Sequence, residues 1–150
     1  MNLRLPLTSL RCASMVTLSG CVLLSAFAQA EDAIESVSLE AVRVLAGDGF
    51  ERRDTRWRGQ IPTGEARTHK VFLYKQNEYC FLLADAGRLE GVKFAIYNSK
   101  GELIDAGTFH RADRTLRGLH LRPPTSGVYY IRIVNDDNAT ASVALTYCFR

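Results

Sequence analysis

The chain has 150 residues, of which 47% are hydrophobic and 23% charged, and its formal net charge at pH 7 is +3. This length predicts one domain that is long enough to bury a core of its own. The sequence contains no repeat of roughly 20 to 50 residues and no low-complexity segment, which excludes a repeat architecture.

The first 30 residues have the pattern of an export signal. Arg4 and Arg11 form its positively charged part, an apolar run spans 15–27, and the small residues Ala28 and Ala30 mark a cleavage site. We therefore predict a signal peptide over 1–30 and a mature domain over 31–150, located in the periplasm or outside the cell. The apolar run is shorter than the roughly 20 residues that a bilayer-spanning helix needs, so no membrane span is predicted.

A second processing site competes with the first. The sequence Leu18-Ser19-Gly20-Cys21 resembles the lipobox of bacterial lipoproteins, in which the cysteine is acylated and becomes the new N-terminus. Apolar residues at 22–24 favour soluble export, because a lipoprotein tether is ordinarily polar. Lipidation at Cys21, in a lipid-anchored envelope protein with a structural or assembly role, is the alternative.

Most of the positive charge belongs to the leader. The loss of Arg4 and Arg11 lowers the basic residues from 19 to 17 against 16 acidic ones, so the mature chain is close to neutral. One exception lies at 51–58, where four arginines accompany Trp57 and could in principle grip phosphate or a stacked base. Acidic residues are interleaved there, which favours a solvated strand edge, and no nucleic-acid partner is predicted.

Two of the four cysteines belong to the mature chain. Cys12 and Cys21 fall in the leader, which leaves Cys80 and Cys148. An even count in an oxidising compartment predicts one disulfide between them, and such a bridge would stabilise the fold by roughly 2–4 kcal/mol. A thiol nucleophile or a metal-binding pair is the alternative interpretation.

A short helix is predicted at about 32–46. Asp32 and Glu35 resemble a capping box, and Gly47 suits the exit. Five apolar residues fall close to the spacing that places them on one helical face: Ile34, Val37, Ala41, Val42 and Leu45.

After residue 50 the hydrophobic pattern changes to period two, with turn residues between short runs. The predicted strands are the run around Trp57 and the segments 70–74, 78–84, 92–97, 103–106, 115–121, 128–134 and 142–149. Eight short strands at regular spacing predict an all-β fold, an eight-stranded antiparallel sandwich that resembles a jelly roll and carries the short N-terminal helix.

The alternation also predicts which faces are buried. Tyr79, Phe81 and Leu83 share one face of their strand, as do Val143, Leu145 and Tyr147, so these are the expected core faces. Cys80 and Cys148 fall on the opposite faces. We therefore expect the bridge to join neighbouring strands on the outer side of one sheet, where opposed positions bring Cβ atoms within about 5 Å.

Two segments carry a resemblance to a known family. FAIYNSKGELI at 94–104 ends a strand in a tyrosine, followed by a polar turn with glycine, and PTSGVYYIRI at 124–133 enters a later strand through proline and glycine. Over roughly 59–149 the chain resembles the bacterial pre-peptidase C-terminal (PPC-like) domain family. The resemblance implies an extracytoplasmic, non-catalytic sandwich that assists binding or folding.

We find no set of residues that predicts catalysis or a metal site. His69, His110 and His120 lack the spacing of zinc ligands, and Ser99 and Ser126 lie in turns without a nucleophile motif. We therefore expect no enzyme activity, no catalytic residues, no metal and no cofactor. A hydrolase would need His110 or His120 to lie beside a serine and a carboxylate in a cleft.

The remaining candidate site consists of aromatic side chains. A binding module would take an unknown protein or a glycan as its partner, and flat aromatic faces stack on sugar rings. The candidates for such stacking are Trp57, Tyr74, Tyr97 and Tyr130. Each could instead pack at a sheet edge or under the helix.

Overall fold

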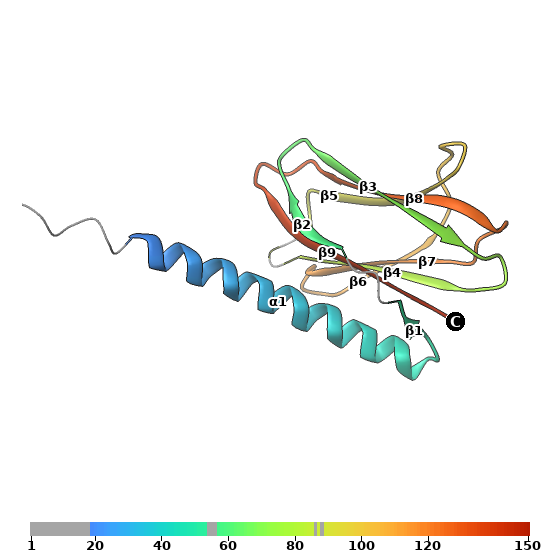
Figure 1. Cartoon of the computed structure of the whole chain (residues 1–150), viewed down its shortest axis with the longest axis horizontal. Coiled ribbons are helices and arrows are strands. Elements are labelled where there is room, and N and C mark those ends of the chain that lie inside the picture. The colour runs from blue at the N-terminus through green and yellow to red at the C-terminus, as the bar shows by residue number, and fades with distance from the viewer. Residues whose placement is uncertain (1–18, 54–56, 86, 88) are drawn as a thin grey trace, which may run out of the picture.

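The computed structural model describes residues 19–53, 57–85, 87 and 89–150, with side chains described from Asp32 onward. This part of the chain forms two β-sheets packed face to face, with one helix outside the larger sheet (Figure 1). The elements are α1 (Ser19–Gly47), β1 (Glu51–Arg52), β2 (Trp57–Ile61), β3 (Ala66–Leu73), β4 (Tyr79–Asp85), β5 (Val92–Asn98), β6 (Gly107–His110), β7 (Leu116–Leu121), β8 (Gly127–Asn135) and β9 (Ala141–Phe149).

The larger sheet has six strands in the order β1-β9-β4-β7-β6, with β2 also pairing with β9. The smaller sheet has three strands in the order β3-β8-β5. Each of these strand pairings is antiparallel. The predicted all-β antiparallel sandwich is therefore confirmed.

The main core lies between the two sheets. Its residues alternate along each strand, as period-two burial requires. The predicted core faces are confirmed, because Tyr79, Phe81 and Leu83 of β4 and Val143, Leu145 and Tyr147 of β9 all belong to this cluster. Ile131 and Ile133 of β8 meet them from the smaller sheet and are fully buried.

A second core lies between the larger sheet and α1. Ile34 is buried there against Leu82 and Ala84 of β4 and Ala144 of β9. The remaining members of the predicted helical stripe, Val37, Ala41, Val42 and Leu45, pack on the same cluster. The helical spacing thus predicted correctly which side of the helix is apolar, and the sheet supplies its partner.

Besides β3, which begins at Ala66 rather than at 70, the elements differ from the prediction in three ways. The described residues contain nine strands rather than eight, because the two-residue strand β1 pairs with the end of β9. A strand at 103–106 is wrong: Leu103 makes only an isolated bridge to Tyr97, and the strand β6 follows at Gly107. The helix is longer than 32–46, since α1 begins at Ser19. The jelly-roll topology stays a prediction.

Part of the predicted leader lies outside the described residues. Residues 1–18, which include Cys12, are not described, and Cys21 lies in the part of α1 whose side chains are not described. The signal peptide and the lipidation of Cys21 therefore stay predictions. Among the helices of the described region, none is both long and apolar enough to cross a bilayer.

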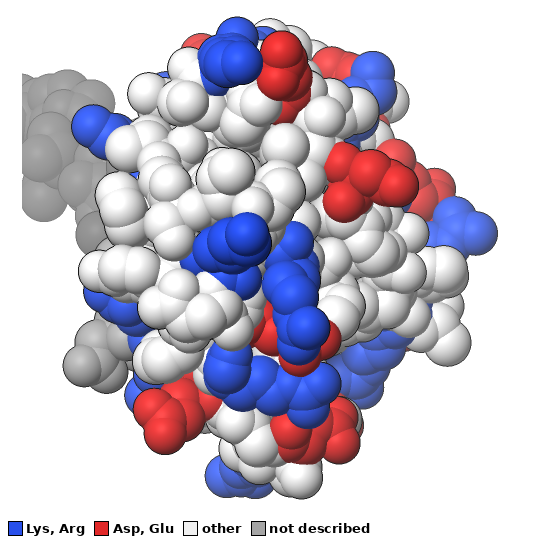
Figure 2. Space-filling model, turned by 90° about the vertical axis from the view of Figure 1, so that its right-hand side faces the viewer, with Lys and Arg blue, Asp and Glu red and all other residues white. Residues whose placement is uncertain are grey.

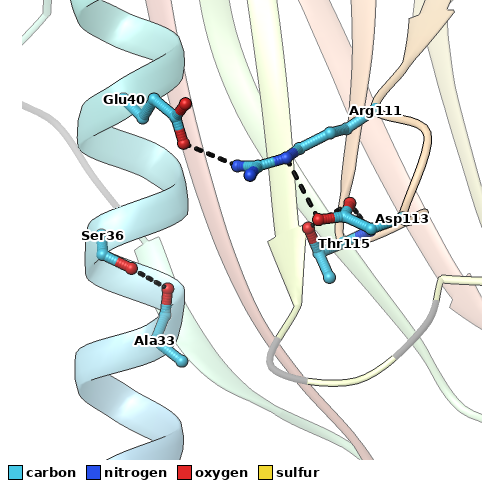
Figure 3. Close-up of polar contacts among 6 residues, drawn as sticks. All are labelled: Ala33, Ser36, Glu40, Arg111, Asp113 and Thr115. Carbon is cyan, nitrogen blue, oxygen red and sulfur yellow. Dashed lines mark hydrogen bonds and ion pairs between the residues drawn. The ribbon is translucent and has the colours of Figure 1, made fainter.

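Ion pairs hold α1 along the sheet. Arg111, in the turn after β6, donates to the Glu40 carboxylate at 2.7 Å and contacts Asp113 at 3.1 Å (Figure 3). Glu35, nearer the N-terminal end of α1 than Glu40, pairs with Arg58 of β2. These ion pairs flank the apolar stripe. They add to the apolar burial that holds the helix on the sheet.

Candidate functional site

The smaller sheet has one face against the core and one face toward solvent. We call the solvent side the open face, because α1 covers the larger sheet instead (Figure 1). Its side chains are Thr68, Lys70 and Phe72 of β3, Val128, Tyr130, Arg132 and Val134 of β8, and Lys93, Ala95 and Tyr97 of β5.

Two of the sequence candidates meet on the open face. Tyr130 lies directly opposite Tyr97 on one side and opposite Lys70 on the other, so the three side chains form one row across the sheet. Directly opposed side chains lie close enough to touch, with Cβ atoms roughly 4.5–5.5 Å apart. The row thus places two half-buried tyrosines and an exposed lysine at neighbouring positions of the open face.

The third tyrosine extends this surface at the end of β3. The rings of Phe72 and Tyr74 are 5.2 Å apart between centroids, at an interplanar angle of 64°. Phe72 is 52% exposed and Tyr74 is 45% exposed, so the pair presents adjoining aromatic surface to solvent. Phe72 was missed by the sequence reasoning, although the alternation of Thr68, Lys70 and Phe72 could have placed it here.

Backbone contacts fix the segment that carries Tyr74. The N–H of Tyr74 donates to the hydroxyl of buried Tyr79 at 3.0 Å, and the N–H of Lys75 donates to Ser126 Oγ at 2.9 Å. The hydroxyl of Tyr129, in turn, donates to the carbonyl of Thr125 at 2.9 Å. The turn before β8 and the segment after β3 are therefore held together, so that Tyr74 is presented by an ordered support.

The open face is positively charged. Arg132 projects from the central strand β8, Lys70 from the edge strand β3 and Lys93 from the other edge strand, β5. Asp136 contacts Lys93 at 2.5 Å and raises the pKa of that ammonium group through hydrogen bonding and charge. The Asp136 carboxylate thus pairs with Lys93, so the positive charge of the open face comes from Lys70 and Arg132.

Trp57 lies away from the other candidates. Its ring lies 4.6 Å from that of His69, between the edges of the two sheets, and it packs against the main core. The indole also lies across Gly59, where an added Cβ would come within 2.7 Å of the ring. Trp57 therefore packs at a sheet edge, which was the alternative interpretation of this residue.

The structure places Cys80 directly opposite Cys148 in the β4–β9 ladder, on the face away from the main core. Glu78 and Arg150, two residues away, exchange both backbone hydrogen bonds, so Cys80 and Cys148 form a hydrogen-bonded pair with Cα atoms about 5.5 Å apart. That separation suits a disulfide. Both side chains are free thiols in this structure, and α1 buries them. The disulfide stays a prediction.

The residues around Cys80 do not form an activated nucleophile. Burial raises the pKa of the Cys80 thiol to about 12, whereas a reactive cysteine needs a lowered pKa. His120 lies opposite Cys80 in β7, and its Nε2 contacts the Glu78 carboxylate at 2.5 Å. In the part of the chain that the structure describes, no group of three histidine, cysteine or acidic residues could hold a metal ion.

Glu78 is the centre of a charged cluster near the C-terminus. Arg150 Nε donates to its carboxylate at 2.7 Å, and Arg122 approaches to 3.7 Å. The hydrogen bond from Arg150 is the main cause that lowers the pKa of Glu78. Seen from the end that carries the C-terminus, Lys and Arg side chains gather around acidic ones (Figure 2). Since Arg150 also donates to the Asp48 carbonyl at 2.8 Å, the cluster ties the chain end to the end of α1.

Comparisons with known proteins give weak similarities. The chain matches no family and no curated protein. Among solved structures it is similar to a periplasmic inhibitor of g-type lysozyme from Aeromonas hydrophila, at 12% identity and a TM-score of 0.49, over 69% of this chain and 90% of that one. It is also similar to the lipase BlEst2 of Bacillus licheniformis in its propeptide form, at 12% identity and a TM-score of 0.47. That second match covers 63% of this chain and 21% of the lipase chain.

Proposed function

We propose that this protein is an exported, non-catalytic binding module that recognises a protein or a glycan through its open face. The observation that carries the proposal is the row of Lys70, Tyr130 and Tyr97 beside the exposed Phe72–Tyr74 pair. Exposed aromatic patches on soluble proteins mark interaction sites. A PPC-like ancestry and export from the cytoplasm belong to this proposal and rest on the sequence patterns.

The chemistry of the open face favours a particular kind of ligand. Tyrosine rings offer flat surfaces for stacking together with hydroxyl groups for hydrogen bonds, which suits a sugar ring or an aromatic side chain. The positive charge of Lys70 and Arg132 favours acidic groups on the same partner. We therefore expect an acidic glycan or an acidic protein surface to bind more tightly than a neutral one.

A capture experiment with matched variants tests the proposal. The purified protein is immobilised, exposed to envelope extract and to an array of acidic and neutral glycans, and compared with the double variant Tyr97→Ala/Tyr130→Ala. We expect the double variant to lose most of the captured ligand. Trp57→Ala, which removes an aromatic ring away from the open face, should capture the same set as the unchanged protein.

Either of two results would contradict the proposal. Equal capture by the double variant and the unchanged protein would exclude the open face as the binding surface. Loss of capture by Trp57→Ala alone, with its melting temperature unchanged, would place the site at the 51–58 segment instead. Thermal melting of each variant separates lost binding from lost folding.

A further inference from the structure

The strand β6 is a free edge of the larger sheet. It ends the strand order of that sheet, and all four of its residues are exposed. The N–H of Arg111 donates to the carbonyl of Leu116 at 3.0 Å, so these two residues form a hydrogen-bonded pair next to the β6–β7 ladder. Hydrogen-bonded pairs alternate along an antiparallel ladder, so Phe109 and Gly107 bond to β7. The N–H and C=O groups of Thr108 and His110 therefore point away from the sheet.

The edge of β6 differs from the two edges of the smaller sheet. The segment after β5 turns back and runs along the edge of that strand, where the N–H of Ile104 donates to the carbonyl of Ile96 at 2.9 Å. β3 carries Arg67 and Lys70, and charged side chains discourage strand addition at an edge. β6 has neither protection. Its one large apolar residue, Phe109, is 39% exposed.

Grooves lie on both sides of β6. One of about 570 Å³ lies on the side of the smaller sheet and is lined by Phe94, His110, Arg114 and Arg117 together with Glu90. Another, of about 250 Å³, lies between β6 and α1, and its lining includes Val37, Ala41, Val44, Leu116 and Phe109. A more polar hollow of about 560 Å³ also borders β6, next to Glu78, His120 and Arg150.

Phe109 separates the two grooves. Its ring stands over Gly118 of β7, where an added Cβ would come within 1.9 Å of a ring atom. Gly118 thus leaves the space in which the Phe109 ring lies, and Phe109 is among the lining residues of both grooves. Phe109 is therefore supported by the sheet while it stays accessible from the edge.

We propose that β6 binds an extended peptide segment of a protein partner as an additional strand of the larger sheet. The backbone groups of Thr108 and His110 supply the hydrogen bonds, as in other cases of strand addition. Successive side chains of a strand point to opposite faces, so neighbouring residues of the peptide enter different grooves. This edge lies on the opposite sheet from the open face, and the proposal does not depend on the function proposed for that face.

The two grooves define the chemistry of the peptide. The groove under α1 is apolar and accepts a side chain such as leucine or valine. The groove toward the smaller sheet carries two arginines and a histidine against one carboxylate, Glu90, which already pairs with Arg114. Arg117 donates to the carbonyl of Val92 at 2.6 Å, and a carbonyl does not neutralise its charge. The favoured peptide therefore places an acidic residue next to an apolar one.

The test uses a phage-displayed library of random heptapeptides panned against the purified protein, followed by fluorescence polarisation with the enriched peptides. We expect enriched sequences in which an acidic residue neighbours an apolar one. Thr108→Pro removes an N–H that points away from β7, so the variant keeps its ladder but should bind at least tenfold more weakly. Thr68→Pro is the matched control. The N–H of Asn135 donates to the carbonyl of Glu65 at 2.9 Å, so by alternation the N–H of Thr68 also points away from the β3–β8 ladder, and the variant should change affinity less than twofold.

A second readout does not depend on the proline variants. When the peptide binds, amide hydrogen exchange of Thr108 and His110 should slow by more than tenfold. The proposal is overturned if no peptide is enriched, if Thr108→Pro and Thr68→Pro weaken binding equally, or if the slowed amides lie elsewhere. A dimer that dissociates on Thr108→Pro would place a second copy of this chain on the edge and would also overturn it. Tyr97→Ala/Tyr130→Ala should leave peptide affinity unchanged, which separates this proposal from the open face.

Discussion

The two sheets of the sandwich are covered to different extents. Every residue of β4 in the larger sheet is buried, because the main core lies on one face and α1 on the other. In β3 of the smaller sheet, exposed residues alternate with buried or half-buried ones from Thr68 to Leu73. Aromatic side chains in β4 are explained by packing. Phe72 and the pair Tyr97–Tyr130 lie outside both cores, on the face of the smaller sheet that the proposed function uses.

Truncation of one side chain in each sheet should give the largest difference. Leu82 is 1% exposed beneath α1, so Leu82→Ala should lower the free energy of unfolding by about 2–5 kcal/mol. Tyr130→Ala on the open face should cost less than about 1 kcal/mol, because it removes only cross-strand contacts at a solvated surface. Urea denaturation measures both. Equal losses would mean that the open face is part of the core.

The predicted disulfide would add to the difference in stability between the two sheets, since it would join two strands of the larger sheet. If Cys80 and Cys148 are bridged, reduction should lower stability by about 2–4 kcal/mol. Thermal melting with and without reductant measures the loss, and intact mass reports the two hydrogens gained. Cys148→Ala should not respond to reductant. A protein exported under oxidising conditions that still titrates two free thiols would contradict the bridge.

The charged cluster around Glu78 should make the stability of the larger sheet depend on pH in the acidic range. Arg150 lowers the pKa of Glu78 in the folded protein below its ordinary value of 4.5. The stabilisation is therefore complete above that value and is lost as the pH falls through the lowered pKa. Between pH 7 and pH 3 the unchanged protein should lose a few degrees more in melting temperature than Glu78→Gln.

The control for this acid effect is Glu65→Gln. Glu65 only approaches Arg67, at 3.6 Å on the surface, so its replacement should leave the acid response of the protein unchanged. An identical acid response in Glu78→Gln and the unchanged protein would show that the cluster does not contribute.

The smallest effect is expected for the ion pair that docks the helix. Arg111→Ala removes the contact with Glu40 that Figure 3 shows, and exposed pairs contribute roughly 0.2–1 kcal/mol. The difference from the unchanged protein should shrink further in 1 M salt. A loss as large as that of Leu82→Ala would mean that charge, rather than the apolar stripe, holds α1 on the sheet.

Much of the fold follows from the periodicity of the sequence. The stripe of Ile34, Val37 and Leu45 predicted the buried face of the helix, and alternation in β4 and β9 placed the two cysteines opposite the core face. That this opposite face is also buried was not anticipated. The nearly continuous apolar run of β4 was the available signal, because a strand covered on both faces loses its alternation.

The strand β6 could not be placed from the sequence. Leu103 and Ile104 are the more apolar pair, and Ile104 does pack on the main core, but outside a strand. Thr108 and His110 lack an apolar pattern because an edge strand over open grooves buries little. The candidate site was predicted in part: the tyrosines were named, yet their meeting with Phe72 and Lys70 depends on pairing between strands that are far apart in the chain.

Tyrosine labelling measures the accessibility of the open face most directly. The protein is treated with tetranitromethane with and without its captured ligand, and nitration of each of the six tyrosines is read by mass spectrometry. We expect labelling at Tyr74, Tyr97 and Tyr130 in the free protein, little at buried Tyr79 and Tyr129, and protection of the first three when ligand binds. Unchanged nitration of Tyr97 and Tyr130 in the complex would contradict the assignment of the open face as the binding surface.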